Sequence, residues 1–458
     1  MTELSPDLIF KPQKMKSKLC LVILFCLLTG PALAIDPDLG RFSTAKQQQI
    51  RALAETITNK VPAIVWDFYD AVRVDDWETA TNLAGRINLA SHRYQYATND
   101  DRLTPVLGTA IWPPISESFG AYEQFHEWDN RWLHRFGSEI IGSMPPGSIY
   151  FGGTDPGRFV ISVLCDSQVD GRPFFTLTQN QLADSTYMAY LRTMYGRKIH
   201  IPSVEDVQAA FTNYQNDAES RMKRGQLKPG EDVRTVDGHI QVSGVVAVME
   251  VNGLLVKKIF DDNPDRPFFV EESFPLDWMY PYLTPHGLIF QLNRQDVPEI
   301  THGEMAKDQA YWKKLTDEML GPWLDDKTSL PAVCDFADKY GQGKHLDDFK
   351  GDKDFAGNPQ TRKCFSKLRS SIAGMYAWRA EHAATSDERQ RMYDAAELAF
   401  RQSYAICPYS PEALYRYVNL LLEHRRFDDA ILLAKTSLHQ DPDNEQLKSL
   451  LSRLFEMR

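Results

Sequence analysis

Apolar positions near the N-terminus recur with the period of an amphipathic helix. Between residues 43 and about 96, Ile50 and Leu53 belong to series spaced by three and four residues. The run Val-Asp-Asp-Trp at 74–77 interrupts the spacing and separates two helical stretches. The sequence therefore predicts a helical hairpin in an N-terminal helical region, residues 35–105.

Short apolar runs alternate with helical stretches between residues 106 and 310. The segments 148–151 and 174–177 have the length and composition of buried strands, and helical spacing follows each. Strands and helices in this order predict a parallel sheet with helices on both faces. Further strands are expected at 198–201, 268–271 and 288–292. We expect one α/β domain over residues 106–310.

The segment 311–365 departs from this rhythm. Residues 335–363 contain six Asp, five Lys and four Gly with few large apolar side chains, a composition typical of an exposed connector. Cys334 and Cys364 flank this polar stretch. A disulfide between them would close a loop of about 30 residues and stabilise it by roughly 3–4 kcal/mol, so we expect a bridge if the protein is exported.

The end of the chain repeats itself with a period of 34 residues. Tyr393, Ala396, Leu398, Ser403 and Pro408 are followed 34 positions later by Phe427, Ala430, Leu432, Ser437 and Pro442. Small residues let paired helices approach closely, and the prolines end helices. The period is that of tetratricopeptide helix pairs, so residues 366–458 resemble a tetratricopeptide array ending in a capping helix.

Such arrays bind other protein chains, which makes a protein partner the expectation. In the 34-residue frame, the helix beginning at Pro411 turns Leu414, Tyr417, Val418 and Leu421 inward. Tyr415 and Asn419 then lie on the concave face and are the candidate partner-binding residues. The N-terminal hairpin resembles a degenerate pair of the same kind, with Trp77 and Ala80 in the places of the aromatic and small residues. A plain helical hairpin fits that pattern equally well.

Together these patterns predict a fold of the α/β plus all-α class. A parallel-type α/β domain is preceded by a helical hairpin and followed by the helical repeat array. The composition is that of a folded protein, with 43% hydrophobic and 25% charged residues. The net charge of −11 disfavours nucleic acid as a partner.

The first 34 residues have the order of a secretory signal peptide. Lysines precede the apolar run Leu19–Leu28, and the small residues Ala32 and Ala34 form a signal-peptidase site. The apolar run is shorter than the ~20 residues of a permanent membrane anchor. We expect cleavage after Ala34 and a periplasmic or secreted mature protein.

The turn after the first predicted strand is the sharpest candidate for a ligand site. Gly152 and Gly153 follow the strand, and a helix begins soon after them, so backbone N–H groups would face a ligand at the sheet edge. Asp155 and Arg158 belong to the same turn, and Arg158 would contact an anion. The alternative is a tight turn in which Asp155 is the helix N-cap and Pro156 the first helical residue.

The second predicted strand leads into a polar segment at the same edge. Gln179, Asn180 and Asp184 would face the first turn and bind a polar ligand such as a sugar. The commoner use of such side chains at helix starts is to cap backbone groups. Both interpretations remain open from the sequence.

No catalytic residue, metal site or cofactor is predicted. Glu271 and Glu272 end a strand, but adjacent strand residues point to opposite faces, so at most one enters a given cleft. His286 lies between Pro285 and Gly287 and is interpreted as a turn residue. An aromatic helix face favours core packing over a sugar platform; it comprises Phe125, Trp128, Trp132 and Phe136. His126 and His134 lack metal-ligand spacing.

Four segments carry a further resemblance: GSIYFGGTDPGRF at 147–159, TQNQLADSTYMAYLR at 178–192, IPSVEDVQAAF at 201–211 and MYPYLTPHGLIFQL at 279–292. They resemble the soluble region that follows the membrane spans in bacterial protein O-mannosyltransferase-like proteins, which also end in tetratricopeptide repeats. The likeness covers about residues 140–458 and implies a role in the cell envelope. The multi-spanning part of that family is missing here, so no transferase activity or catalytic residue is carried over.

The leading hypothesis is an exported, non-enzymatic scaffold that binds a protein partner through its repeats. The alternatives are a carbohydrate-binding or glycan-processing module at the sheet edge and an accessory subunit of a membrane glycosyltransferase.

Overall fold

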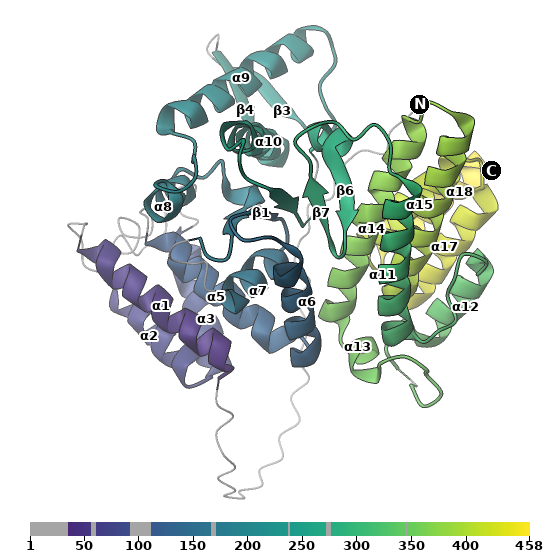
Figure 1. Ribbon diagram of the computed structural model, residues 1–458, viewed down its shortest axis with the longest axis horizontal. Coiled ribbons are helices and arrows are strands. Elements are labelled where there is room, and N and C mark those ends of the chain that lie inside the picture. Colours follow the sequence, from purple (N-terminus) through teal and green to yellow (C-terminus); the bar gives the residue numbers. More distant parts are fainter. Residues whose placement is uncertain are drawn as a thin grey trace, which may run out of the picture. The chain divides into compact units, whose positions relative to one another are not determined.

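The computed structural model describes residues 35–55, 61–91, 111–165, 171–236, 239–271, 276–344 and 346–458 (Figure 1). The predicted signal peptide, residues 1–34, lies outside the described residues. The chain divides into two compact units. The first comprises residues 1–118, 180–193 and 200–262, and the second comprises residues 119–179, 194–199 and 263–458. The segment expected to form one α/β domain, 106–310, is therefore shared between both units.

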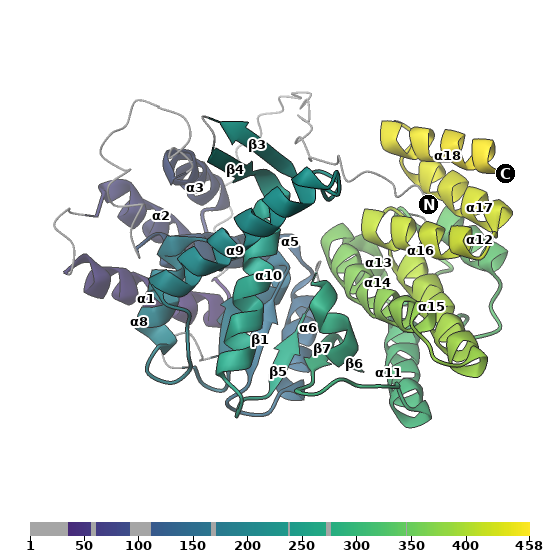
Figure 2. The same ribbon diagram turned by 90° about the horizontal axis from the view of Figure 1, so that it is seen from above.

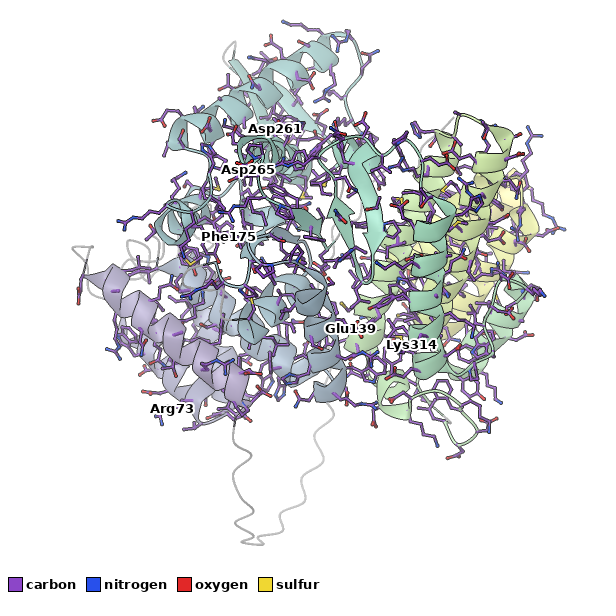
Figure 3. The ribbon with its side chains drawn as sticks, viewed as in Figure 1. Arg73, Glu139, Phe175, Asp261, Asp265 and Lys314 are labelled. Carbon is purple, nitrogen blue, oxygen red and sulfur yellow. The ribbon has the colours of Figure 1, made fainter. Side chains whose placement is uncertain are left out.

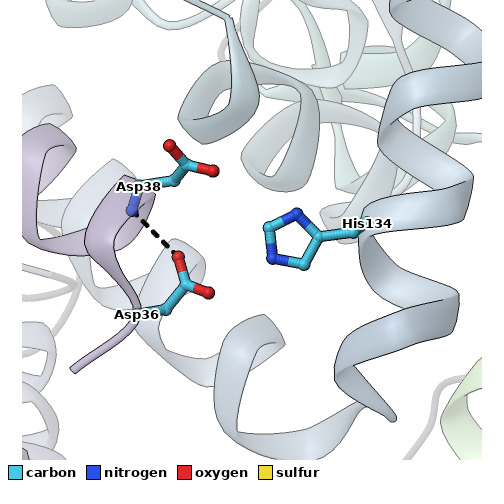
Figure 4. Close-up of side chains that lie close together, drawn as sticks. All are labelled: Asp36, Asp38 and His134. Atoms are coloured by element: carbon cyan, nitrogen blue, oxygen red, sulfur yellow. Dashed lines mark hydrogen bonds between the residues drawn. The ribbon is translucent and has the colours of Figure 1, made fainter. Parts of the chain in front are cut away.

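The first unit is mainly helical. Its elements are α1 (Pro37–Ala54), α2 (Ala63–Arg73), α3 (Trp77–Ser91), the start of α5 (Trp112–Glu127), most of α8 (Ser185–Tyr195), α9 (Val204–Lys223), the hairpin β3 (Asp232–Val236) and β4 (His239–Ser243), and α10 (Gly244–Asp262). Its interior holds a charged side chain: Lys46 of α1 is 1% exposed and donates to the hydroxyl of Tyr190 of α8 at 2.7 Å and to Glu117 of α5. Asp36 caps α1 by accepting from the backbone N of Asp38 at 2.9 Å (Figure 4).

The turn between α2 and α3 repeats that between α16 (Pro411–Glu423) and α17 (Phe427–Gln440). Asp75 and Arg425 both have positive φ, 55° and 58°. The backbone N of Asp75 donates three residues back at 3.1 Å, as that of Arg425 does at 3.0 Å. Ala80 and Ala430, the small residues of the second helices, are both 0% exposed. The predicted hairpin is confirmed, and its turn has the same backbone geometry as the turn between α16 and α17.

A five-stranded sheet forms the centre of the second unit. Its strand order is β2-β1-β5-β7-β6, from β1 (Ile149–Gly152), β2 (Phe175–Thr178), β5 (Phe268–Val270), β6 (Leu283–His286) and β7 (Ile289–Leu292). β1 pairs in parallel with β2 and β5, whereas β7 is antiparallel to β5 and β6. The sheet is mixed, so the prediction of a parallel sheet is only partly correct. Gly287, with φ 64°, makes the tight turn that reverses the chain between β6 and β7.

The strand expected at 198–201 is not formed. The backbone N–H groups of Lys198 and Ile199 both donate to the carbonyl of Tyr195, at 2.8 and 3.1 Å, so the chain here continues the turn that ends α8. Helix α7 (Asp155–Leu164) connects β1 to β2, as the alternation of elements predicted.

The segment expected to be an exposed connector, 311–365, is largely helical. It contains the end of α11 (His302–Leu320), all of α12 (Leu330–Tyr340) and α13 (Lys353–Gly357), and the start of α14 (Pro359–Glu381). Trp312, Val333 and Phe355 are each 0% exposed. The composition misleads because the polar residues lie outside while a few well-spaced apolar residues supply the buried face.

The expected bridge between Cys334 and Cys364 is wrong, because both are buried thiols that form no disulfide. Cys334 belongs to α12, where its thiol bonds Thr436 of α17 and burial raises its pKa to about 12. Cys364 lies within α14 (Pro359–Glu381). The segment needs no cross-link, since it is fastened by its own buried apolar side chains.

The C-terminal array consists of α14, α15 (Ser386–Ile406), α16, α17 and the terminal α18 (Glu445–Met457), which Figure 2 shows packed side by side. The four residues expected to turn inward from α16 are at most 2% exposed: Leu414, Tyr417, Val418 and Leu421. Buried charge joins the array to α11, because Arg369 of α14 binds Asp308 at 2.9 Å and the hydroxyl of Tyr376 donates to the same carboxylate at 3.1 Å. Among the described residues, no helix is long and apolar enough to span a membrane.

Candidate functional site

The first candidate site is the turn between β1 and α7. Thr154, not Asp155, is the N-cap: its hydroxyl accepts from the backbone N of Gly157 at 3.0 Å, and Asp155 is the first helical residue. Gly152 is the last residue of β1, at the carboxyl edge of the parallel strands, whereas the sequence places it in the turn after the strand. The turn thus presents N–H groups at a helix N-terminus, the arrangement that binds anions.

An internal carboxylate occupies these N–H groups. Glu271 directly follows β5 and accepts from the backbone N of Gly153 at 2.7 Å and of Thr154 at 2.8 Å; the hydroxyl of Thr154 donates to its other oxygen. Glu271 is 0% exposed. A Cβ on Gly157 would lie 1.8 Å from its Oε2, so only glycine leaves room for the carboxylate. The anion expected from outside is therefore supplied by the chain itself.

Arg158 is likewise engaged within the turn. Its guanidinium binds Asp155 at 2.5 Å, one helical turn away, and lies 4.3 Å from the ring centroid of Phe159. The structure brings the two predicted residues together as an ion pair with each other. Neither is directed to an external ligand by this geometry.

Gln179, Asn180 and Asp184 serve the start of α8 and the loop before it. Asp184 accepts from the backbone N of Thr186 at 2.7 Å and of Tyr187 at 3.2 Å, so it caps α8. Asn252 of α10 holds the loop by donating to the carbonyl of Asn180 at 3.1 Å. Gln179 follows β2 and is 1% exposed. The hydrogen bonds of Asp184 match the capping interpretation.

A cluster of carboxylates lies beside the same turn. Burial raises the pKa of Glu123 in α5 to about 7, and the nearby carboxylates of Glu127 and Asp155 raise it further in the same direction. Sequence reasoning missed Glu123, because its apposition to Asp155 depends on how α5 packs on α7. The Glu123 side chain is partly exposed. Because its pKa lies near 7, its charge changes close to neutral pH.

The remaining candidates are structural. His286 bonds the carbonyl of Ser143 at 2.8 Å through Nε2 and precedes the Gly287 turn. The aromatic helix face forms core: Trp132 lies 4.8 Å from Phe355 and Phe136 lies 5.9 Å from Phe365, between ring centroids. Glu272 lies outside the described residues.

The face of the repeats that the sequence predicts to be concave is the second candidate site. The first helices of its pairs, α14 and α16, are linked by Lys367 and Glu412 at 3.6 Å and by Ser371 and Arg416 at 3.0 Å. Asn419 continues this row on α16 and is exposed.

Tyr415 lies on the neighbouring row of α16 and is half-buried. Burial raises the pKa of its hydroxyl, while Arg453 of α18 opposes the shift. The two predicted residues thus lie on the surface shared by α14, α16 and α18.

Charge varies along this surface. Lys363 and Lys367 lie in the first half of α14, whereas Glu381 ends it. Burial and the nearby Glu381 raise the pKa of Glu423, the last residue of α16. Since Lys367 is paired with Glu412, the clearest charge on this surface is the acidic end formed by Glu381 and Glu423.

Comparison with protein-family models matches residues 389–454 to the tetratricopeptide repeat family. Neither the curated proteins nor the solved structures gave a match to this chain. The matched range contains most of α15 and all of α16 and α17, whose 34-residue spacing and buried Ala396 and Ala430 are described above. Residues 389–454 are therefore tetratricopeptide repeats.

Proposed function

We propose that this chain is an exported scaffold that binds a protein partner on the concave surface of its tetratricopeptide array. Tetratricopeptide repeats generally bind protein chains. The observation that carries the proposal is the surface of α16: four side chains of the helix are buried inward, while Asn419 is exposed beside the half-buried ring of Tyr415.

The same surface suggests how a partner is oriented. A tyrosine ring with its polar hydroxyl is a frequent anchor at interfaces. The acidic end formed by Glu381 and Glu423 favours a partner segment that carries a positive charge at that end. Charge of this kind sets orientation and rate of association more than affinity.

Export is part of the proposal and is supported by the basic, apolar and small-residue order of residues 1–34. The resemblance to the soluble part of O-mannosyltransferase-like proteins supports the envelope as the location. A glycan-binding role at the β1 turn has no specific support, because Glu271 occupies the N–H groups that an external anion or sugar would use.

A paired substitution tests the proposal. The variant Y415A/N419A should lose an envelope protein that the wild-type chain retains on an affinity column, because the anchor and its neighbour are removed. Its melting temperature should stay unchanged. The matched control is Q390A/K435A, which alters exposed positions on the second helices α15 and α17 and should retain the partner.

Two results would contradict the proposal. One is equal retention of all bound proteins by both variants. The other is a lower melting temperature for Y415A/N419A with no bound protein lost, which would make the surface an internal interface.

A further inference from the structure

A cavity of about 1240 Å³ lies in the second unit at the amino ends of the parallel strands. The segments that precede β1, β2 and β5 contribute Gly147, Pro173 and Arg266, respectively. The short turn after α8 adds Arg197 and Lys198. This cavity is at the opposite ends of the strands from the Glu271 turn and does not involve the repeats.

The lining is strongly basic. Arg172, Arg197, Lys198 and Arg266 all line the cavity, and the lining residues that the structure describes, which leave out residues 166–170, include no aspartate or glutamate. Within the described parts of the chain, neither Arg197 nor Arg266 forms an ion pair. The whole protein carries a net charge of −11, so this concentration of positive charge is local.

Arg266 is held in place without being neutralised. Its guanidinium donates to the carbonyl of Gly147 at 3.3 Å and of Lys198 at 3.1 Å. It also lies 5.5 Å from the ring centroid of Phe175. Carbonyl oxygens and an aromatic face orient a guanidinium but leave its full charge available to an anion.

Two glycines shape the rim. Gly147 has φ 80°, and a Cβ there would lie 2.9 Å from Nη1 of Arg266. Gly171 has φ 76°, and a Cβ there would lie 2.2 Å from the ring of Phe175. The backbone N of Gly147 donates to the carbonyl of Pro173 at 2.7 Å and ties the two rim segments together. Larger residues would displace the groups that line the cavity.

The cavity also has an apolar part. Phe175 packs edge-on against Tyr195, with 5.3 Å between ring centroids, and Ile141 and Leu164 line the same space. Figure 3 labels Phe175 among the side chains of the second unit. An apolar floor beside fixed cations suits a ligand that has both an anionic group and an apolar portion.

We propose that this cavity binds a phosphate-bearing small molecule, with the phosphate between Arg197 and Arg266 and the apolar portion against Phe175. Several positive charges around one space match a group with more than one negative charge better than they match a single carboxylate. Guanidinium groups present paired donors that fit phosphate oxygens. The proposal is independent of partner binding by the repeats.

Calorimetric titration of the full-length protein with inorganic pyrophosphate tests the site. The wild-type chain should bind pyrophosphate more tightly than citrate, an anion with carboxylates alone. R197A should weaken pyrophosphate binding by about tenfold, because one charge-assisted pair is lost, and R197A/K198A should weaken it further. Arg197 is exposed, so R197A should keep the wild-type melting temperature.

The matched control is K307A/K314A, which removes two exposed positive charges on α11; Figure 3 labels Lys314. This variant should bind pyrophosphate as the wild type does. Vesicles of phosphatidylcholine with and without phosphatidylglycerol separate a lipid phosphate from a soluble one: binding to the anionic vesicles that R197A weakens would assign the phosphate to a lipid headgroup. The proposal fails if neither pyrophosphate nor anionic vesicles bind, if citrate binds as tightly, or if R197A and the control bind alike.

Discussion

Glu271 determines the chemistry of the β1 turn. Its buried carboxylate accepts two backbone N–H groups at 2.7 and 2.8 Å at the start of α7. Such bonds to a charged acceptor are stronger than neutral ones, and the helix N-terminus favours negative charge. The turn resembles a site for an external anion, but its N–H groups instead hydrogen-bond Glu271 and so link the end of β5 to the start of α7.

The variant E271Q should lower the free energy of unfolding by about 2–3 kcal/mol, because an amide nitrogen cannot accept from the turn and the negative charge is lost. Urea unfolding measures the difference. A matched control is E412Q, which changes a carboxylate on the surface of α16 and should have a small effect. Equal stability of E271Q and the wild type would show that the turn does not depend on the carboxylate.

Glu123 should make the stability of the fold depend on pH. Its pKa is raised to about 7 by burial and neighbouring carboxylates, so the folded state favours the protonated form. The stability that protonated Glu123 contributes to the folded state is therefore fully present below the ordinary glutamate pKa. It is lost as the pH rises through about 7. E123Q should unfold at a higher temperature than the wild type at pH 8 and at the same temperature at pH 4.

At pH 8 the free energy of unfolding of E123Q should exceed that of the wild type by about 1 kcal/mol. The value is small because partial exposure screens the repulsion between Glu123 and the neighbouring carboxylates. Thermal unfolding of both proteins at the two pH values measures it. A constant difference between them at both pH values would contradict a titrating origin.

At the scale of elements, the α2–α3 and α16–α17 turns have one geometry. Asp75 and Arg425 both adopt left-handed backbone conformations, which cost energy for residues with a Cβ. The turn is set by the helix pair rather than by the residue at its centre, since an acid occupies it in one case and a base in the other.

D75G and R425G should each stabilise the protein slightly, by about 0.5 kcal/mol, because relief of the backbone cost exceeds the added entropy of the unfolded chain. R389G is the control, since Arg389 is exposed within α15 and glycine there should destabilise by about 1 kcal/mol. Chemical unfolding of the three variants decides it; destabilisation of all three alike would refute the strained turns.

At the scale of the whole molecule, sequence patterns predicted the features that depend on residues close together in the chain. The 34-residue period predicted the inward face of α16 correctly, because the same packing contacts recur in every helix pair. The capping role of Asp184 was one of two interpretations, and only the structure decides between them. The polar composition of 335–363 hid α12 and α13, since a few apolar residues suffice to bury a short helix.

Contacts between residues far apart in the chain could not be predicted from the sequence. Glu271 meets Gly153 across 118 positions, and Glu123 meets Asp155 only because two helices pack together. The reversal at Gly287 makes the sheet mixed, although the alternation of strands and helices predicts a parallel one. The basic cavity combines residues from five separate segments, none of which carries a recognisable motif.

The central claim is that the concave surface of the repeats binds a partner, and site-specific photo-crosslinking tests it most directly. A benzophenone amino acid at position 419 should crosslink an envelope protein in living cells, because Asn419 is exposed at the centre of that surface. The same amino acid at position 435, exposed on α17, should give no such product. Crosslinks from position 435 and none from position 419, or crosslinks from 419 only to this chain itself, would contradict the account.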